Sequence, residues 1–197
     1  MDLLDKDIRE PLFEWLEQQY PRIRILEEKT IGRSRADVLL ILQQGLIGIE
    51  IKSDADTYAR LNRQVKDYDR YYDYNVIIAG TRHAAHVAEH VPEWWGIVTV
   101  EREENRVDFF EMRKPHSNPK RKIEKQLTLL WRMELSAIQQ RFGLPKYEQK
   151  SKAFVQKKLL EKIPPEELHA AIIDALFERD YTLVEDQIAR YRSDHSR

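Results

Sequence analysis

The stretch LIGIEIKSDADT, residues 46–57, places two charges near the end of an apolar run. Every residue from Leu46 to Ile51 except Glu50 is aliphatic or glycine, and Lys52 follows them. An ionised group is costly to bury unless it is paired or bound to a ligand. The stretch therefore predicts a buried strand that ends either in a structural salt bridge or in part of an active site.

Hydrophobic periodicity on both sides of this strand predicts the order helix, three strands, helix, strand. The first helix is expected at residues 5–21 and the three strands at 22–31, 36–42 and 46–53. Short links between the strands predict an antiparallel meander. A second helix is expected at 57–73, and the strand at 75–80 should lie parallel to its neighbour because a helical crossover precedes it.

The remaining chain divides into a hairpin and a helical region. A short helix is expected at residues 82–91, and a hairpin at 96–113 should turn near Glu104 and Asn105. The proline-containing stretch 114–120 reads as a linker. Helices are then expected at 122–142, at 151–162 and from the segment 163–168 onward, followed by a polar tail. The sequence thus predicts an α/β fold, with an αβββαβ core and a mixed sheet in residues 1–115 and an α-helical C-terminal region in residues 116–197.

The composition is that of a globular protein without disulfides. Of 197 residues, 42% are hydrophobic and 34% are charged, and none is cysteine. The apolar runs are too short for a membrane span and the acidic N-terminus is unlike a signal peptide, so we expect a cytoplasmic protein with no membrane partner. Residues 1–115 hold 17 Lys/Arg and 22 Asp/Glu, whereas residues 116–197 hold 16 and 12. Basic clusters favour phosphate backbones, but a solvated helix face is an equally good reading.

Asp37 is the residue that gives the pair Glu50 and Lys52 a chemical context. The tight QQG link pairs the start of strand 36–42 with the end of strand 46–53, so Asp37 should lie across from both charges. Residues 50 and 52 share a face because strand side chains alternate. Two neighbouring carboxylates repel unless a cation lies between them, and oxygen ligands suit Mg²⁺ or Mn²⁺.

The pattern Asp37, twelve residues, Glu50-Ile51-Lys52 within an αβββαβ order resembles the PD-(D/E)xK nuclease superfamily, which has the restriction-endonuclease-like fold. Ala36 stands where the motif has proline, a departure that removes no ligand. Gln64 and Tyr68, four apart on one helical face, resemble the Gln-x-x-x-Tyr motif of the RecB-like branch. The block from GRSRAD to VPEWWGI is also similar to a small bacterial family seen in phage and mobile-element contexts. The nuclease-like part covers about residues 1–113.

The resemblance implies a metal-dependent nuclease that hydrolyses phosphodiester bonds in DNA. Asp37, Glu50 and the Ile51 carbonyl would bind Mg²⁺ or Mn²⁺, and Lys52 would orient the attacking water or stabilise charge in the transition state. Gln64 and Tyr68 would hold the nucleic acid or support the site.

A further carboxylate is expected from the first helix or first strand. Glu28 is the first choice, with Glu27 and Glu14 as alternatives, and strand alternation should let only one of Glu27 and Glu28 face the site. Arg33 and Arg35 are expected either to touch phosphate or to pair with these glutamates.

Several features have simpler readings. His83, His86 and His90 could bind Zn²⁺ or Ni²⁺, although structural sites usually draw ligands from separated segments. Trp94 and Trp95 could stack on bases, but at least one should close the core. Tyr68 could itself be a core residue.

A different class of function also stays open, because a fold does not guarantee an activity. The chain could be a catalytically silent DNA-binding or assembly module of a mobile-element, defence or repair system. The helical C-terminal region could dock a protein partner, bind DNA or support a homodimer. Deletion of residues 120–197 would separate delivery of the nuclease from a structural role.

Overall fold

The computed structural model describes residues 2–104 and 106–179 and begins with the predicted αβββαβ order. The bounds in chain order are α1 Asp5–Gln19, β1 Arg24–Ile31, β2 Ser34–Leu42, β3 Gly45–Lys52, α2 Leu61–Tyr71 and β4 Tyr74–Gly80. A 3₁₀ turn, η1 Tyr58–Arg60, leads into α2, and the predicted hairpin forms β5 Gly96–Glu103 and β6 Arg106–Arg113. The α/β prediction with a helical C-terminal region is confirmed.

The six strands form one mixed sheet in the order β1-β2-β3-β4-β5-β6. The short links make β1, β2 and β3 antiparallel neighbours, and the crossover through α2 makes β4 parallel to β3. β5 continues parallel to β4, and β6 returns antiparallel at the edge. The predicted meander, crossover and hairpin are therefore all present.

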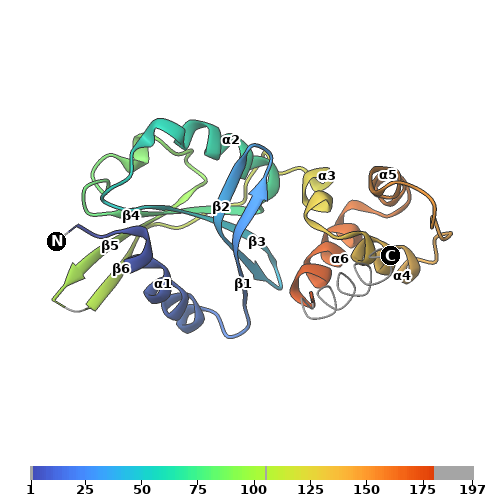
Figure 1. Cartoon of the computed structure of the whole chain (residues 1–197), viewed down its shortest axis with the longest axis horizontal. Helices are drawn as coiled ribbons and strands as arrows, with labels where there is room; N and C mark the ends of the chain where they lie inside the picture. Colours follow the sequence, from blue (N-terminus) through green and yellow to red (C-terminus); the bar gives the residue numbers. More distant parts are fainter. Residues whose placement is uncertain (1, 105, 180–197) are drawn as a thin grey trace, which may run out of the picture.

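Helices cover both faces of the sheet, as Figure 1 shows with α2 above it and α1 below. Alternate residues of β2 contribute to two separate cores, Val38 and Leu40 toward α1, and Leu39 and Ile41 toward α2. A strand covered on both faces is apolar almost without interruption. This double burial explains why β3 also reads as one apolar run and why its two charges are conspicuous.

The C-terminal region contains shorter helices than the sequence predicts. Its elements are α3 Ile123–Gln126, the 3₁₀ turn η3 Leu127–Leu129, α4 Arg132–Arg141, α5 Lys152–Lys162 and α6 Pro165–Phe177. The prediction of one helix over 122–142 is wrong, because the chain is extended at Leu130 and Trp131. Leu127, Leu129 and Leu130 are all buried, and a continuous helix could not turn these three residues to one core. The predicted polar tail lies mostly in residues 180–197, outside the described residues.

The predicted helix at 82–91 is also wrong. The segment is a series of turns with one short 3₁₀ turn, η2 Val87–Glu89. Only Val87 and Val91 are buried in it, and so small an apolar face does not stabilise an isolated helix.

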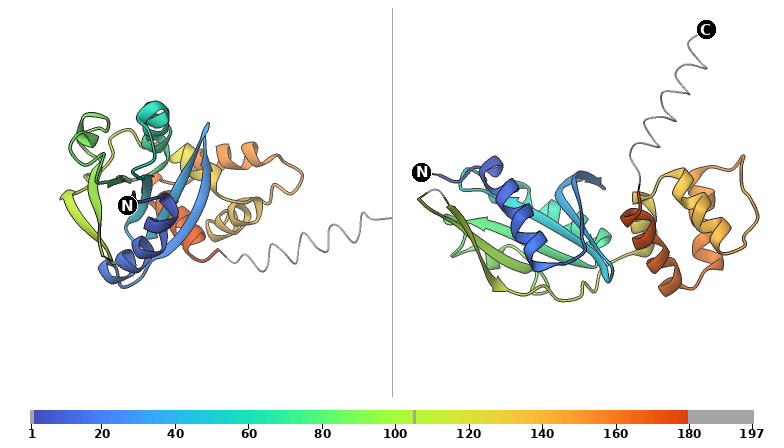
Figure 2. Two further views of the ribbon diagram at one scale, coloured as in Figure 1. Left: turned by 60° about the vertical axis from the view of Figure 1, so that its left-hand side comes forward. Right: turned by 90° about the horizontal axis from the view of Figure 1, so that it is seen from below.

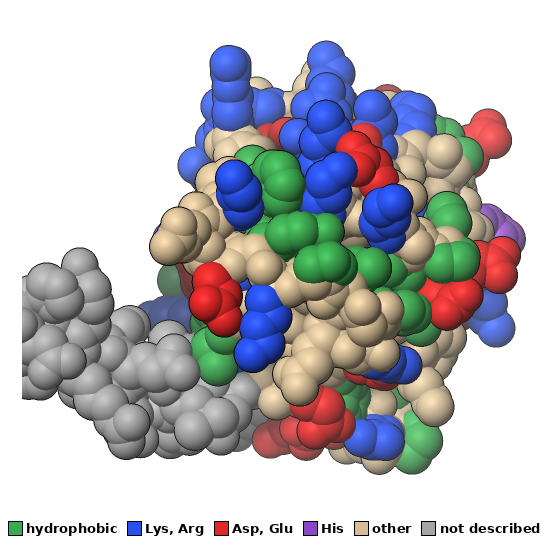
Figure 3. All heavy atoms as spheres, turned by 90° about the vertical axis from the view of Figure 1, so that its right-hand side faces the viewer, with side chains coloured by type: hydrophobic (Ala, Val, Ile, Leu, Met, Phe, Trp, Pro, Cys, Tyr) green, Lys and Arg blue, Asp and Glu red, His purple; other side chains and the backbone are tan. Residues whose placement is uncertain are grey.

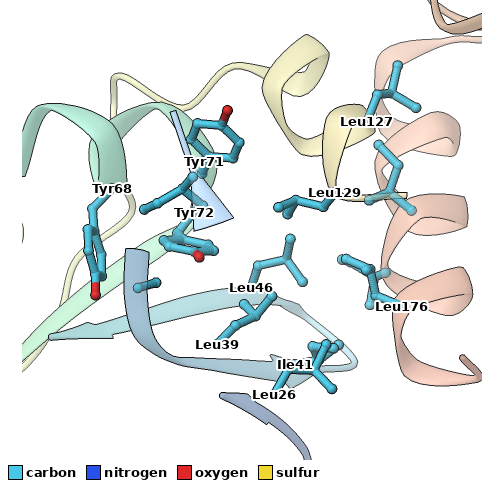
Figure 4. Packing of buried hydrophobic residues seen from close by; sticks show 14 of the residues in the cluster. Leu26, Leu39, Ile41, Leu46, Tyr68, Tyr71, Tyr72, Leu127, Leu129 and Leu176 are labelled. Carbon is cyan, nitrogen blue, oxygen red and sulfur yellow. The ribbon is translucent and has the colours of Figure 1, made fainter. Parts of the chain in front are cut away.

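The C-terminal helices pack against the end of the sheet and share its core. Figure 2 shows them gathered at one end of the sheet, and Figure 4 shows Leu129 and Leu176 facing Leu46 and Leu39. These side chains belong to one continuous buried cluster. The division at residue 115 stays a prediction. No helix in the part of the chain that the structure describes is long and apolar enough to cross a membrane.

Candidate active site

β2 and β3 part from each other at Asp37 and Glu50. The backbone pairing ends at Val38 and Ile49, and beyond it side chains join the strands. The Asp37 carboxylate accepts the Ile51 N–H at 2.8 Å, and the Tyr68 hydroxyl accepts the Asp37 N–H at 3.2 Å. The parted strand ends therefore leave room for polar side chains that a continuous ladder would exclude.

Glu50, Lys52, Gln64 and Tyr68 form a buried polar cluster beside this opening. Lys52 Nζ donates to Glu50 Oε1 at 2.7 Å and to Gln64 Oε1 at 3.2 Å, and Gln64 Nε2 also donates to Glu50 Oε1. The Tyr68 hydroxyl donates to Glu50 Oε2 at 2.8 Å. Only 1% of Glu50 and 3% of Lys52 is exposed, and the cluster pairs them as buried charges require.

The inner face of α2 supplies Gln64 and Tyr68 together because they are four residues apart. Figure 4 shows Tyr68 projecting from α2 toward the sheet. Burial and the charge of Glu50 raise the pKa of Tyr68 well above its usual value, so the hydroxyl keeps its proton and can donate. A Cβ at Gly48 would collide with the Tyr68 and Tyr72 rings, which explains the glycine in β3 at this point.

Asp37 is more exposed than Glu50 and Lys52, with 19% of its side chain accessible to solvent. Burial, and then the negative charge of Glu50, raise the pKa of Asp37 from 3.8 to about 7. Both effects disfavour the ionised carboxyl. The expected repulsion between the two carboxylates is therefore present, and a cation would relieve it.

Arg9 of α1 is a cation that the sequence analysis did not connect with Asp37. Its guanidinium lies 3.7 Å from Asp37 Oδ1, 3.0 Å from Glu28 and 3.2 Å from Glu27. Burial lowers the pKa of Arg9, but its hydrogen bond to Asp5 and the nearby acidic charges outweigh burial and leave it raised, so Arg9 stays charged. Only the packing of α1 on the sheet brings Arg9 here, so no local sequence signal marks it.

The backbone at Glu28 departs from regular strand geometry. The pairing of β1 with β2 passes from Glu27 to Lys29, and Glu28 has a φ of 55°. This local distortion of β1 leaves its register with β2 unchanged, and both glutamates reach Arg9. Which of the two glutamates faces the site stays a prediction. Glu28 also pairs with Arg35 at 2.5 Å, as one of the two predictions for Arg35 had it.

Asp37 and Glu50 are too few to form an all-protein metal cage, so a Mg²⁺ or Mn²⁺ held by them would have to keep several waters. Within residues 2–104 and 106–179, no group of three His, Cys, Asp or Glu could hold a metal. Mg²⁺ often takes one or two carboxylates and keeps several waters, a pattern that Asp37 and Glu50 can satisfy. The Ile51 carbonyl as a further ligand stays a prediction, and so does a metal-binding role for Glu28. Glu14 is exposed on α1.

A basic cleft of about 430 Å³ opens beside Asp37 and Gln64. Its walls come from the β1–β2 turn and from the start of α2, and they carry the arginines Arg33, Arg35, Arg60 and Arg63. Arg33 and Arg35 were predicted as nucleic-acid contacts. Arg60 and Arg63 were missed, although Arg60 lies four residues before Gln64, a spacing that puts both on one side of a helix.

Comparison with known proteins gives the family. The family model for bacteriophage P4 protein cII matches residues 2–196. The chain belongs to the bacteriophage P4 protein cII family. No curated protein matches it.

One solved structure resembles this cII-family protein weakly. It is Pyrococcus furiosus SfsA in complex with Ca²⁺, with 16% identity and a TM-score of 0.34. The match covers 56% of the cII-family chain, which spans 62% of the SfsA chain. A likeness at this level says nothing about function.

The histidines and tryptophans considered as possible ligands of metal or bases contact other side chains of the cII-family protein. His83 and His90 both pack against the Tyr58 ring, and His86 is exposed beside Glu89. The three histidines are thus not arranged as a metal site among the described residues. Both the Trp94 and the Trp95 indole N–H donate to Asp69, and Trp95 is fully buried. The prediction that at least one tryptophan closes the core is confirmed.

Proposed function

We propose that this cII-family protein is a metal-dependent nuclease of the PD-(D/E)xK type that hydrolyses phosphodiester bonds in DNA. One observation carries the proposal. Asp37, Glu50 and Lys52 meet where β2 and β3 part, and this point borders an arginine-lined cleft. Paired carboxylates, a lysine and adjacent arginines are the groups that phosphodiester hydrolysis uses.

The proposed role of each site residue follows from its charge. Asp37 and Glu50 would hold Mg²⁺ or Mn²⁺, which when bound supplies a Lewis acid and lowers the pKa of a water. The Lys52 ammonium would offset negative charge that develops on the phosphate. To do so it would give up its hydrogen bond to Glu50 or to Gln64 and donate to the phosphate instead. Arg33, Arg60 and Arg63 would bind the neighbouring phosphates. Gln64 and Tyr68 hold the Glu50 carboxylate in place from α2.

A silent nuclease fold that binds DNA is the second candidate, and a specific observation favours it. Glu50 and Lys52 are already paired and buried, and Arg9 contacts the one carboxylate that is partly exposed. Lysine and arginine side chains in such a site can neutralise its carboxylates, so that no metal is needed to stabilise them. In that case the arginine-lined cleft would still bind nucleic acid without cleaving it.

Cleavage of labelled oligonucleotides tests the choice between the two candidates. Single-stranded DNA, duplex DNA and RNA would each be incubated with Mg²⁺ or Mn²⁺, with EDTA as the metal-free control. We expect wild type to cleave DNA only with metal, Lys52→Ala not to cleave it, and the exposed α1 variant Lys6→Ala to behave as wild type. If wild type cleaves no better than Lys52→Ala but still binds DNA, the silent module is the correct reading.

A further inference from the structure

The outer face of α2 carries a row of unpaired positive charges. Arg63, Lys66 and Arg70 are spaced three and four apart and are all exposed, and Arg60 of η1 precedes them. Cations three or four residues apart on a helix repel each other. Such a row is therefore unfavourable for the isolated protein unless a polyanion binds to it.

Burial of the acidic residues removes the counter-charges from this face. The two acids between residues 58 and 72 are Asp67 and Asp69, and both are buried. Asp67 accepts from Ser34 and the Arg33 N–H, and Asp69 accepts from the two tryptophans. The charges of α2 are thus segregated, with the acids facing the core and the bases facing solvent.

The row continues into the C-terminal region. The Lys122 N–H donates to the Arg70 carbonyl at 3.0 Å, which places exposed Lys122 at the end of α2. Figure 3 shows Lys and Arg side chains gathered along the upper part of the C-terminal face, where α3 and α5 lie in Figure 1, with α2 farther from the viewer. We call Arg60, Arg63, Lys66, Arg70 and Lys122 the basic track. Within the described residues, none of the five has an ion-pair partner.

We propose that the basic track binds the phosphate backbone of a nucleic acid and leads it into the arginine-lined cleft. Arg60 and Arg63 belong both to the track and to the cleft, so the two surfaces are continuous. An 11-residue α2 is about 16 Å long, enough for roughly five base pairs of a duplex. The track extends the proposed nuclease function by assigning its substrate path, but backbone binding itself needs no cleavage.

Fluorescence anisotropy in EDTA measures this binding without catalysis. The probes are a single strand of about 20 nucleotides and the matching duplex, titrated over a series of salt concentrations. The track variant is Lys66→Gln/Arg70→Gln. The matched control, Lys6→Gln/Arg106→Gln, also removes two exposed positive charges but outside α2 and α3. Thermal unfolding checks that both variants keep the fold.

We expect the track variant to bind more weakly and with a shallower salt dependence. Loss of two phosphate contacts lowers the slope of log K against log salt by about 1.4 for single strands and 1.8 for duplexes, with roughly tenfold weaker binding at ~0.1 M salt. The control should stay within about twofold of wild type. Equal binding by the track variant and the control would overturn the proposal. Displacement of the probe by polyglutamate as readily as by unlabelled DNA would also overturn it, and would assign the track to an acidic protein.

The outcomes also separate the track from the proposed nuclease function. Track-dependent binding by a protein that never cleaves DNA with Mn²⁺ would keep the track and reject the nuclease. Cleavage by wild type together with unchanged binding by the track variant would keep the nuclease and reject the track.

Discussion

The neighbours of the Asp37 carboxyl group act on its pKa in opposite directions. Burial and Glu50 raise its pKa to about 7, whereas the Ile51 N–H and Arg9 lower it. The sequence predicted Asp37 beside Glu50 because strand register follows from a short turn. It could not predict Arg9, because that contact depends on how α1 packs on the sheet. Local spacing therefore identified the acidic pair, and tertiary packing determined its charge environment.

The raised pKa makes a prediction for stability against pH. In the unfolded chain Asp37 loses its proton near pH 3.8, but in the folded protein it keeps the proton up to about pH 7. The folded state then binds more protons than the unfolded state, so stability falls as pH rises from about 4 to 7. Asp37→Asn should flatten this decline by at most about 4 kcal/mol. Urea unfolding of both proteins at several pH values measures the free energy of unfolding. The same pH dependence for Asp37→Asn as for wild type would contradict the environment described for Asp37.

Lys52 and Glu50 make a second prediction at the residue scale. Lys52→Met removes one partner of a buried ion pair and leaves the other charge uncompensated, which should destabilise the fold by about 3 kcal/mol. Glu50→Gln/Lys52→Met removes both charges and should recover part of that loss. Guanidinium unfolding of the two variants gives the comparison. Equal stability of Lys52→Met and wild type would mean that the pair is not buried as described.

At the element scale, the strands and α2 followed their sequence patterns, and each exception has a physical cause. The helical spacing in α2 was sufficient to place Gln64 and Tyr68 on one face. The left-handed conformation at Glu28 involves a single residue, which a strand pattern with a period of two cannot reveal. The break at Leu130 arises because three neighbouring leucines all enter the core, a tertiary demand that overrides helix propensity.

The left-handed conformation at Glu28 can be tested by comparing two substitutions there. Both Glu28→Ala and Glu28→Gly remove the contacts to Arg9 and Arg35, so their difference isolates the backbone. Because φ is 55° there, glycine should be more stable than alanine by about 1 kcal/mol. Thermal or urea unfolding measures the difference. Alanine equal to or better than glycine would show that β1 has no left-handed residue at this position.

At the scale of the whole molecule, the C-terminal helices share a core with the sheet. The sequence predicted a separate region after the linker because prolines and a change of pattern mark residues 114–120. It could not show that Leu129 and Leu176 would join Leu46 in one cluster, since they lie 83 and 130 residues away from it in the sequence.

Deletion of residues 120–197 should therefore damage the remaining protein. Loss of the helices exposes the apolar face around Leu39 and Leu46, which should lower the melting temperature and create binding sites for a hydrophobic dye. Calorimetry and dye fluorescence of residues 1–119 against the full chain measure this effect. An unchanged melting temperature without dye binding would show that the two parts fold independently.

The central claim is that Asp37 and its partners form a site for phosphodiester hydrolysis, and a single-turnover cleavage rate tests it most directly. The substrate is an end-labelled DNA oligonucleotide with Mn²⁺, and the proteins are wild type, Asp37→Asn and the exposed α1 control Glu17→Gln. Asparagine can still accept the Ile51 N–H, so the fold should survive. The account predicts a rate at least about 100-fold lower for Asp37→Asn and an unchanged rate for Glu17→Gln. Equal rates for wild type and Asp37→Asn would contradict it.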